Sequence, residues 1–301
     1  MLTRILKFLL LIIPVLVCVA FITLAERKVL RLIGIRQGPN KVSAQGIMQP
    51  IADAIKLANK GTNYLSNFSL LTYYLSVIII LFCSLILWSR VKIIETSVRW
   101  KFSFLVMMLI LGVACIKTII AGWRTYGKYP LIGRMRTVSL IISYESVIYL
   151  CILFVVWISK RFRITEISQQ EIYAIYLIFP LILFFWTPSI MAELNRTPYD
   201  FSEGERELVR GFNTEFGSGS FTIIFLREYS NIILFIMISC FIFFSSSRTV
   251  KFIIFFIFFN YWIIWMRRTL PRIRFDKFMN RAWKFYIPRM TIIVLTIFIK
   301  I

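Results

Sequence analysis

Apolar residues in this sequence come in long blocks of about 20 residues, rather than in the periodic stripes of a soluble domain. A helix of about 20 residues crosses a hydrocarbon core roughly 30 Å thick, and in lipid a spanning segment must satisfy its own backbone polar groups. The blocks are Leu2–Leu24, Leu70–Trp88, Phe102–Ala121, Val138–Ile158, Ile172–Met191, Phe221–Phe244, Val250–Met266 and Phe285–Ile299. The sequence therefore predicts an all-α, polytopic transmembrane bundle of about eight spans, forming a single integral membrane domain over residues 1–301.

The charge distribution supports this interpretation. The chain of 301 residues has a formal net charge of +22, which in a soluble protein would suggest a nucleic-acid partner. Here the lysines and arginines lie mainly in short loops, so membrane topology accounts for them and we expect no nucleic-acid ligand. The more basic loops, 26–69, 122–137, 192–220 and 267–284, are expected on the cytoplasmic or matrix side.

The first block continues into Glu26 without a small-residue cleavage site, which favours a span over a signal peptide.

Residues that could hold a redox or metal centre are scarce. The five cysteines lie inside the apolar blocks and show no C-x-x-C spacing, which argues against iron–sulfur and zinc sites. There is no histidine, and neither a Walker nor a dinucleotide-binding glycine pattern is present. We therefore expect no redox centre in this chain. Proton transfer would use carboxylates, tyrosine, lysine, water or a bound substrate.

The segment after the first block predicts an amphipathic helix over residues 44–58. A turn at Gly38-Pro39-Asn40 precedes it. Its apolar residues recur at helical spacing, and polar residues occupy the opposite face, a pattern too polar for a span. The apolar face comprises Ala44, Ile47, Met48, Ile51, Ile55 and Ala58, and the polar face comprises Gln49, Asp53, Lys56 and Lys60. Such a helix can lie along the membrane surface, pack on neighbouring helices, or do both.

The few carboxylates are concentrated in one loop. Of the 14 acidic residues, six lie in the segment 193–215: Glu193, Asp200, Glu203, Glu205, Glu207 and Glu215. Two stretches, Thr197–Asp200 and Ser202–Glu205, resemble capping boxes that would open a helical turn, and this accounts for two of the six. Carboxylates this close raise one another's pKa and can share protons. The loop is therefore either a solvated acidic segment or part of a functional acidic cavity.

Charged residues also interrupt the predicted spans, where each is costly unless it is paired or hydrated. Glu26 and Arg27 are expected to close the first span, Arg227 and Glu228 could pair with each other or with another helix, and Lys117 could extend toward the interface. Glu145 has no charged partner nearby in the sequence except Arg136, about two and a half helical turns earlier, which makes Glu145 the best single candidate for a proton relay. These residues indicate a membrane protein that moves protons or cations, or couples to one that does.

Several sequence strings carry a family resemblance over nearly the whole chain, in order. They are Ala25–Leu30, Arg36–Val42, Gln49–Leu57, Tyr129–Arg136, Ile142–Glu145, Ala192–Glu205, Glu207–Glu215, Glu228-Tyr229 and Pro271–Asp276. Together these strings resemble the family of subunit 1 of respiratory complex I, the NADH:quinone oxidoreductase. The string from Glu193 to Glu215 is the most specific of them.

The resemblance implies a core membrane subunit of that complex, with ubiquinone as substrate. NADH, FMN and the iron–sulfur clusters would be bound by partner subunits. The implied partners are the peripheral-arm subunits of the quinone module, the neighbouring small membrane-arm subunits, and membrane lipids. The implied location is the inner mitochondrial membrane, with a bacterial cytoplasmic membrane as the alternative. The excess of phenylalanine, isoleucine and lysine also suits an AT-rich organellar genome.

The resemblance also implies two sets of functional residues. The proton-relay candidates are Glu145, Glu193, Asp200, Glu203, Glu205, Glu207, Glu215 and Glu228. The candidates for lining a quinone-access tunnel or docking a partner are Arg27, Arg36, Ala52, Asp53, Arg136, Arg196, Phe212 and Arg274.

The sequence departs from the family pattern at some positions. Leu140 stands where a glutamine is usual, which leaves the hydrogen bonding around Glu145 open. Extra cations stand at Arg124, Lys128, Arg134, Arg210 and Arg227.

Two other functions also fit the acidic loop and the charges inside the spans: a stand-alone proton or cation transporter, and the related subunit of a membrane-bound hydrogenase.

Overall fold

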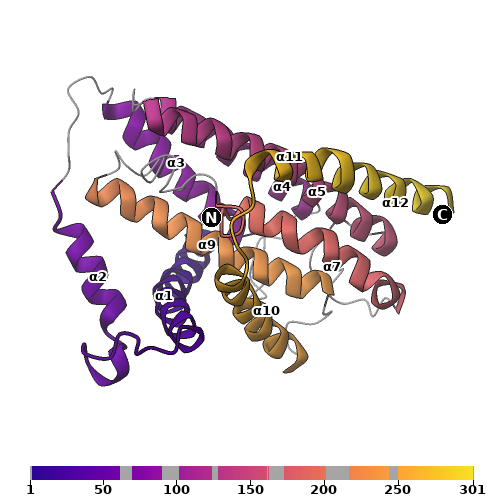
Figure 1. Cartoon of the computed structure of the whole chain (residues 1–301). Coiled ribbons are helices and arrows are strands. Elements are labelled where there is room, and N and C mark those ends of the chain that lie inside the picture. Colours follow the sequence, from indigo (N-terminus) through magenta and orange to yellow (C-terminus); the bar gives the residue numbers. More distant parts are fainter. Residues whose placement is uncertain are drawn as a thin grey trace.

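The architecture is a bundle of helices, and the described residues contain no strand (Figure 1). The computed structural model describes residues 2–61, 70–89, 102–123, 128–160, 162, 173–200, 217–243 and 250–300. Its α-helices are α1 (Leu2–Ile33), α2 (Gln49–Ala58), α3 (Leu70–Trp88), α4 (Ser103–Trp123), α5 (Lys128–Ser159), α7 (Tyr173–Glu193), α9 (Ser218–Phe243), α10 (Val250–Thr269), α11 (Phe275–Arg281) and α12 (Ile287–Lys300).

Each predicted span coincides with one of these helices. Within the described residues, five segments are long and apolar enough to cross a membrane: Phe8–Ile33, Ser103–Ala121, Leu131–Ser159, Gly219–Phe243 and Val250–Thr269. Two shorter apolar segments, Tyr74–Trp88 and Pro180–Glu193, lie in α3 and α7, and the last predicted span corresponds to α12. The prediction of an all-α membrane bundle is therefore confirmed, with the number of spans approximate.

Two helices extend well beyond the apolar blocks that predicted them. Glu26 and Arg27 do not end the first helix, because α1 continues to Ile33. Their position at the membrane interface stays a prediction. Similarly, α5 begins at Lys128, ten residues before the predicted Val138. Arginine and lysine are good helix formers, so a change from apolar to basic residues does not end a helix. As a result, Glu26 lies inside α1 rather than at its end.

Helices α5 and α9 form the centre of the bundle. The α5 face that includes Leu140, Tyr144, Ile148 and Ile152 is almost fully buried, and nearly all of α9 from Ile232 to Phe243 is buried as well. Helix α7 packs against both, and the indole Nε1 of Trp186 on α7 donates a hydrogen bond to Ser239 Oγ on α9 at 3.0 Å.

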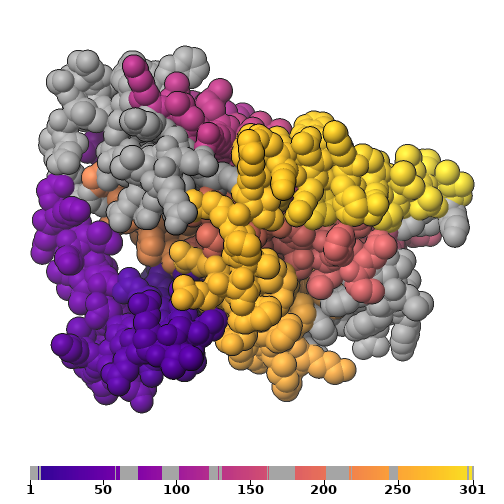
Figure 2. Space-filling model, viewed as in Figure 1, coloured from indigo at the N-terminus to yellow at the C-terminus, as the bar shows by residue number. Residues whose placement is uncertain are grey.

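The outer helices expose apolar side chains. Ile13 on α1, Ile257 on α10 and Ile292 on α12 are each about 60% exposed. Figure 2 shows the segments that carry α10 and α12 on the surface of the molecule. In a membrane protein such apolar faces contact lipid, whereas a soluble bundle would bury them inside the protein.

The predicted amphipathic helix is present, with a later start than expected. A 3-10 turn at Ala44–Gly46 comes first, and the α-helix begins at Gln49, with Pro50 in its first turn, where proline is well tolerated. Helix α2 lies at one edge of the bundle and contacts α1 and α9 (Figure 1). Its apolar residues Ile51 and Ile55 are exposed. Its placement along the membrane surface stays a prediction.

A π-helical segment, Ala282–Tyr286, joins α11 to α12. Phe278, Ala282, Tyr286 and Met290 are all buried, although they are spaced four residues apart. In a regular α-helix that spacing drifts by about 40° at each step, because 3.6 residues complete one turn. The wider π turn reduces the drift, so the four side chains stay on the face that contacts α5.

The contact between α7 and α9 gives a stability prediction. Ser239→Ala should leave the buried indole N–H of Trp186 without this partner. We expect the free energy of unfolding of the subunit to fall by about 1 kcal/mol, and its melting temperature to fall with it. The matched control is Ser189→Ala, whose buried hydroxyl donates, within the described residues, to the carbonyl of Trp186 on its own helix. Equal melting temperatures for the two variants would contradict the prediction.

Candidate functional site

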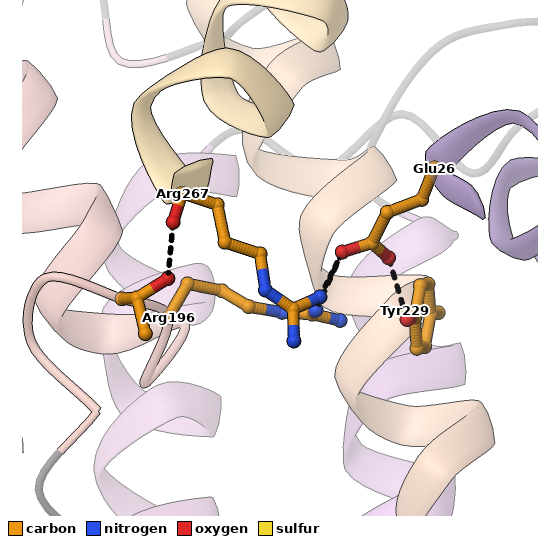
Figure 3. Close-up of polar contacts among 5 residues, drawn as sticks. Glu26, Arg196, Tyr229 and Arg267 are labelled. Carbon is orange, nitrogen blue, oxygen red and sulfur yellow. Dashed lines mark hydrogen bonds and ion pairs between the residues drawn. The ribbon is translucent and has the colours of Figure 1, made fainter. Parts of the chain in front are cut away.

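The most connected polar group in the described residues centres on the carboxylate of Glu26, whose side chain is 8% exposed. Its Oε1 accepts from Arg196 Nη1 at 3.1 Å and also pairs with the guanidinium of Arg267. Its Oε2 accepts from the hydroxyl of Tyr229 at 2.6 Å. Figure 3 shows the four side chains converging from α1, the chain after α7, α9 and α10. We call these four residues the Glu26 network.

The turn after α7 brings Arg196 into the Glu26 network. Asn195 adopts a left-handed conformation with φ 49°, which asparagine tolerates better than most residues, and this reverses the chain directly after the helix. The Arg196 guanidinium carbon then lies 4.5 Å from the centre of the Tyr229 ring. A cation over an aromatic face is favourable, and more so when it is shielded from water.

The same turn is fastened to the end of α10. The hydroxyl of Thr197 donates to the carbonyl of Arg267 at 3.1 Å, and the amide of Ile273 donates to the carbonyl of Pro198 at 3.3 Å. The expected capping box at Thr197–Asp200 is absent, because these residues form a turn and not a helix. The hydroxyl that would have capped a helix instead holds α10 in place. The Thr197–Pro198 peptide bond is cis.

Electrostatics keep the groups in this turn in fixed protonation states. Burial of the Arg196 guanidinium works against its charged form, but the Glu26 carboxylate, Tyr229 and Glu228 together outweigh this and raise the pKa of Arg196 above its usual value. Burial raises the pKa of Tyr199 to about 12, so its phenol stays protonated at physiological pH. The turn thus presents a permanent cation and a neutral hydroxyl.

A cavity of about 170 Å³ lies beside the network. Its charged lining consists of Arg196, Asp200, Glu228 and Arg267, and the rest is formed by Asn195, Thr197, Phe221, Ile224, Phe225 and Tyr229. Asp200 accepts from Arg272 Nη2 at 3.3 Å. Glu228 makes no hydrogen bond or ion pair within the described residues, but it interacts electrostatically with Arg196 and with the buried Arg134 of α5. The cavity therefore combines apolar walls with side chains of both charge signs.

A second group of charges lies deeper in the bundle. Glu193, at the end of α7, interacts electrostatically with Glu145 on α5 and with Arg227 on α9. The hydroxyl of Tyr149 contacts Oε1 of Glu145, a partner that sequence reasoning did not identify. Glu193 Oε2 is buried and has no hydrogen-bond partner in the described part of the chain. Arg227 and Glu228 form no close ion pair with each other among the described residues, although Arg227 does interact electrostatically with Glu228.

The adjacent residues Arg227 and Glu228 connect these two groups. Successive residues project about 100° apart around a helix. Glu228 lines the cavity, while Arg227 interacts electrostatically with Glu193. Two adjacent charged residues of α9 therefore face the cavity and the inner carboxylates, respectively.

The remaining predicted residues are dispersed. Arg27 pairs with Asp53 of α2 at 2.5 Å, and Gln49 donates to the same carboxylate at 3.0 Å. Arg274 pairs with Asp276 at 3.1 Å in an exposed contact, and Arg36 and Ala52 are exposed. Arg136 lies half-buried on α5. Five predicted residues, Glu203, Glu205, Glu207, Phe212 and Glu215, lie outside the described residues.

Sequence reasoning missed three members of the Glu26 network. Glu26 was expected at the membrane interface, and neither Tyr229 nor Arg267 was singled out as a site residue. Glu26 and Tyr229 stand in strings that carry the family resemblance, which is the one signal that could have indicated them. Among the described residues, no group of three or more histidine, cysteine or acidic side chains could hold a metal ion.

Comparisons with known proteins identify the family of this chain. Residues 6–298 match the family model described as NADH dehydrogenase. The chain is 41% identical to the NADH-ubiquinone oxidoreductase chain 1 of Anopheles gambiae, over 93% of this chain and 90% of the relative. The chain belongs to this family. The protein of the same name from Locusta migratoria is 42% identical over 94% of this chain and 91% of the relative, and that from Sminthopsis macroura is 36% identical over 94% of this chain and 92% of the relative.

The Glu26 network gives a prediction for this family member. Glu26→Gln keeps the size of the side chain but removes the negative charge between two arginines, so a buried cation loses its counter-ion. Breaking a buried pair on one side costs about 3 kcal/mol, and we expect a clear fall in the thermal stability of the assembled protein.

The control for this prediction is the same chemical change at an exposed ion pair. In Asp276→Asn the lost partner is Arg274, and both side chains are mostly exposed, so the cost should stay below about 1 kcal/mol. If thermal unfolding showed the two variants to be equally stable, the Glu26 network would not hold the helices together as described.

Proposed function

We propose that this chain is a core membrane subunit of NADH:ubiquinone oxidoreductase, in which it forms part of the quinone-access tunnel and couples quinone reduction to proton translocation. The observation that carries the proposal is the succession of fixed and titratable charges from the cavity inward. It runs from Arg196 and Glu228 at the cavity, through Arg227, to Glu193 and Glu145. The names of the relatives support the assignment to that complex.

The chemistry follows from the cost of burying charge. A carboxylate in an apolar bundle either pairs with a cation or takes up a proton. Glu26 is held between two arginines, so it serves as a fixed charge. Glu145 and Glu193 interact with each other as like charges, so a change of charge at the cavity can alter how many protons they share. We infer that these two residues hold the protons that move.

The redox chemistry would take place elsewhere in the complex. NADH, FMN and iron–sulfur clusters would be bound by peripheral-arm subunits, and ubiquinone would be the substrate that reaches this chain from the bilayer. The partners would be the quinone-module subunits and the small membrane-arm subunits beside this chain. The proposed location is the inner mitochondrial membrane, which fits the animal sources of the similar proteins.

A stand-alone transporter and a hydrogenase subunit are the competing functions. The purified chain, reconstituted alone in vesicles with a pH-sensitive dye, should carry no proton flux, because the driving reaction occurs on other subunits. Flux from the chain alone would overturn the proposal in favour of a transporter. A hydrogenase subunit would co-purify with hydrogen-dependent activity, whereas NADH-dependent reduction of a short-chain quinone supports the proposal.

The inner carboxylates give a direct prediction. Glu145→Gln should lower quinone-linked turnover by at least tenfold, because one of the two interacting carboxylates can no longer exchange a proton. NADH oxidation by an artificial acceptor should not change, since it bypasses this subunit. Tyr149→Phe, which removes the hydroxyl that contacts Glu145, should act in the same direction with a smaller effect.

The matched control for Glu145 is Glu166→Gln, which removes a carboxylate in the basic loop between the fourth and fifth predicted spans. It should leave both activities at their normal values. Unchanged quinone-linked turnover in Glu145→Gln would show that this residue is not part of the proton relay.

Helix α2 gives a prediction about the proposed quinone tunnel. Ala52 on α2 is exposed and lies next to Asp53, which pairs with Arg27 of α1. Ala52→Phe should weaken inhibition by quinone analogues that block the tunnel, because α2 is proposed to line the tunnel and the larger side chain would narrow it. The control is Val250→Phe at the exposed start of α10. Normal inhibitor affinity in Ala52→Phe would argue that α2 does not line the tunnel.

A further inference from the structure

Three basic side chains project outward from α11 and the π-helical segment that follows it. Lys277, Arg281 and Lys284 are all exposed, and their spacing of four and three residues places them on one side of the helix. The residues that follow two of them, Phe278 and Ala282, project about 100° away around the helix and are buried in the core. We call Lys277, Arg281 and Lys284 the basic stripe.

No carboxylate neutralises the basic stripe within the described residues. The nearest acidic residue in the sequence, Asp276, is paired with Arg274 at 3.1 Å. None of the three stripe residues makes an ion pair in the part of the chain that the structure describes. The stripe is therefore a concentrated positive surface that no described acidic side chain pairs with.

The basic stripe leads directly into an apolar surface. Helix α12 begins three residues after Lys284, and its outward side chains Ile292, Leu295 and Phe298 are each more than half exposed. At 1.5 Å per residue, Ile292 lies about 12 Å along the helix from Lys284. Trp283, which is 58% exposed, lies at the junction, and tryptophan is enriched where a membrane meets water. Figure 2 shows this C-terminal segment at the surface of the molecule.

We propose that the basic stripe binds the phosphate of an anionic phospholipid whose acyl chains lie along the outward face of α12. The positive charge of the stripe favours an anion, and the adjoining apolar face favours a hydrocarbon chain within about 12 Å of that anion. An anionic phospholipid carries both on one molecule, whereas free phosphate lacks the chain. This inference requires only that α12 spans the membrane, and it does not depend on the proposed role in quinone chemistry.

The experiment uses the intact complex in its membrane and two photoreactive lipids with the same acyl chains. One is phosphatidylglycerol, which is anionic, and the other is phosphatidylcholine, which is zwitterionic. After illumination, mass spectrometry of peptides covering residues 277–300 measures labelling by each lipid. The anionic lipid should label these peptides many times more strongly than the zwitterionic one.

The double variant R281Q/K284Q tests the residues that carry the charge. Each basic residue near an anionic surface contributes about fivefold to binding, so losing two should reduce the preference for phosphatidylglycerol by roughly thirtyfold. The control K160Q/K251Q also removes two exposed lysines, one at the end of α5 and one at the start of α10, and should leave the preference unchanged.

Several outcomes would overturn the proposal. These are equal labelling by the two lipids, an unchanged preference in R281Q/K284Q, or an equal loss of preference in the control. Adducts on another protein subunit in place of these peptides would show that a partner chain covers the stripe. If the double variant did not assemble, wild-type labelling at increasing salt would decide, because only anionic binding should weaken.

Discussion

The cost of placing charge in an apolar bundle governs the arrangement of the helices around Glu26. An unpaired carboxylate at this depth would cost several kcal/mol, so Glu26 is surrounded by Arg196, Arg267 and Tyr229. Satisfying that one group requires α1, the turn after α7, α9 and α10 to meet at one point. The hydrogen bond between Thr197 and the carbonyl of Arg267 secures the same junction from the backbone.

The cavity depends on this junction, because Arg196 and Arg267 belong both to the Glu26 network and to the cavity wall. With Glu26 holding the two cations in place, Glu228 remains without a hydrogen bond among the described residues and faces the cavity. Charges that are fixed and charges that can change thus lie side by side. The proposed coupling uses this difference, since a fixed cation sets the field in which Glu145 and Glu193 exchange protons.

Much of the fold was predictable because lipid imposes a simple rule: about 20 apolar residues and an internally bonded backbone. Each of the eight predicted spans coincides with a helix. The boundaries at Ile33 and Lys128 were not predictable from hydropathy, because Arg27, Lys28 and Arg134 continue a helix as readily as they follow one. The π-helical segment at Ala282–Tyr286 was missed for a similar reason, since it follows from packing against α5.

The sequence by itself determined the class of protein, the family and the residue types available for proton chemistry. Of the residues it indicated, Glu145 and Glu193 do interact, and Arg196 and Glu228 share one cavity. Only the tertiary structure decided that Arg196 pairs with Glu26, 170 residues away, and that Tyr149 contacts Glu145. The physical reason is that a sequence records which charges exist, while the burial and the partner of each charge depend on helices that meet only in the folded bundle.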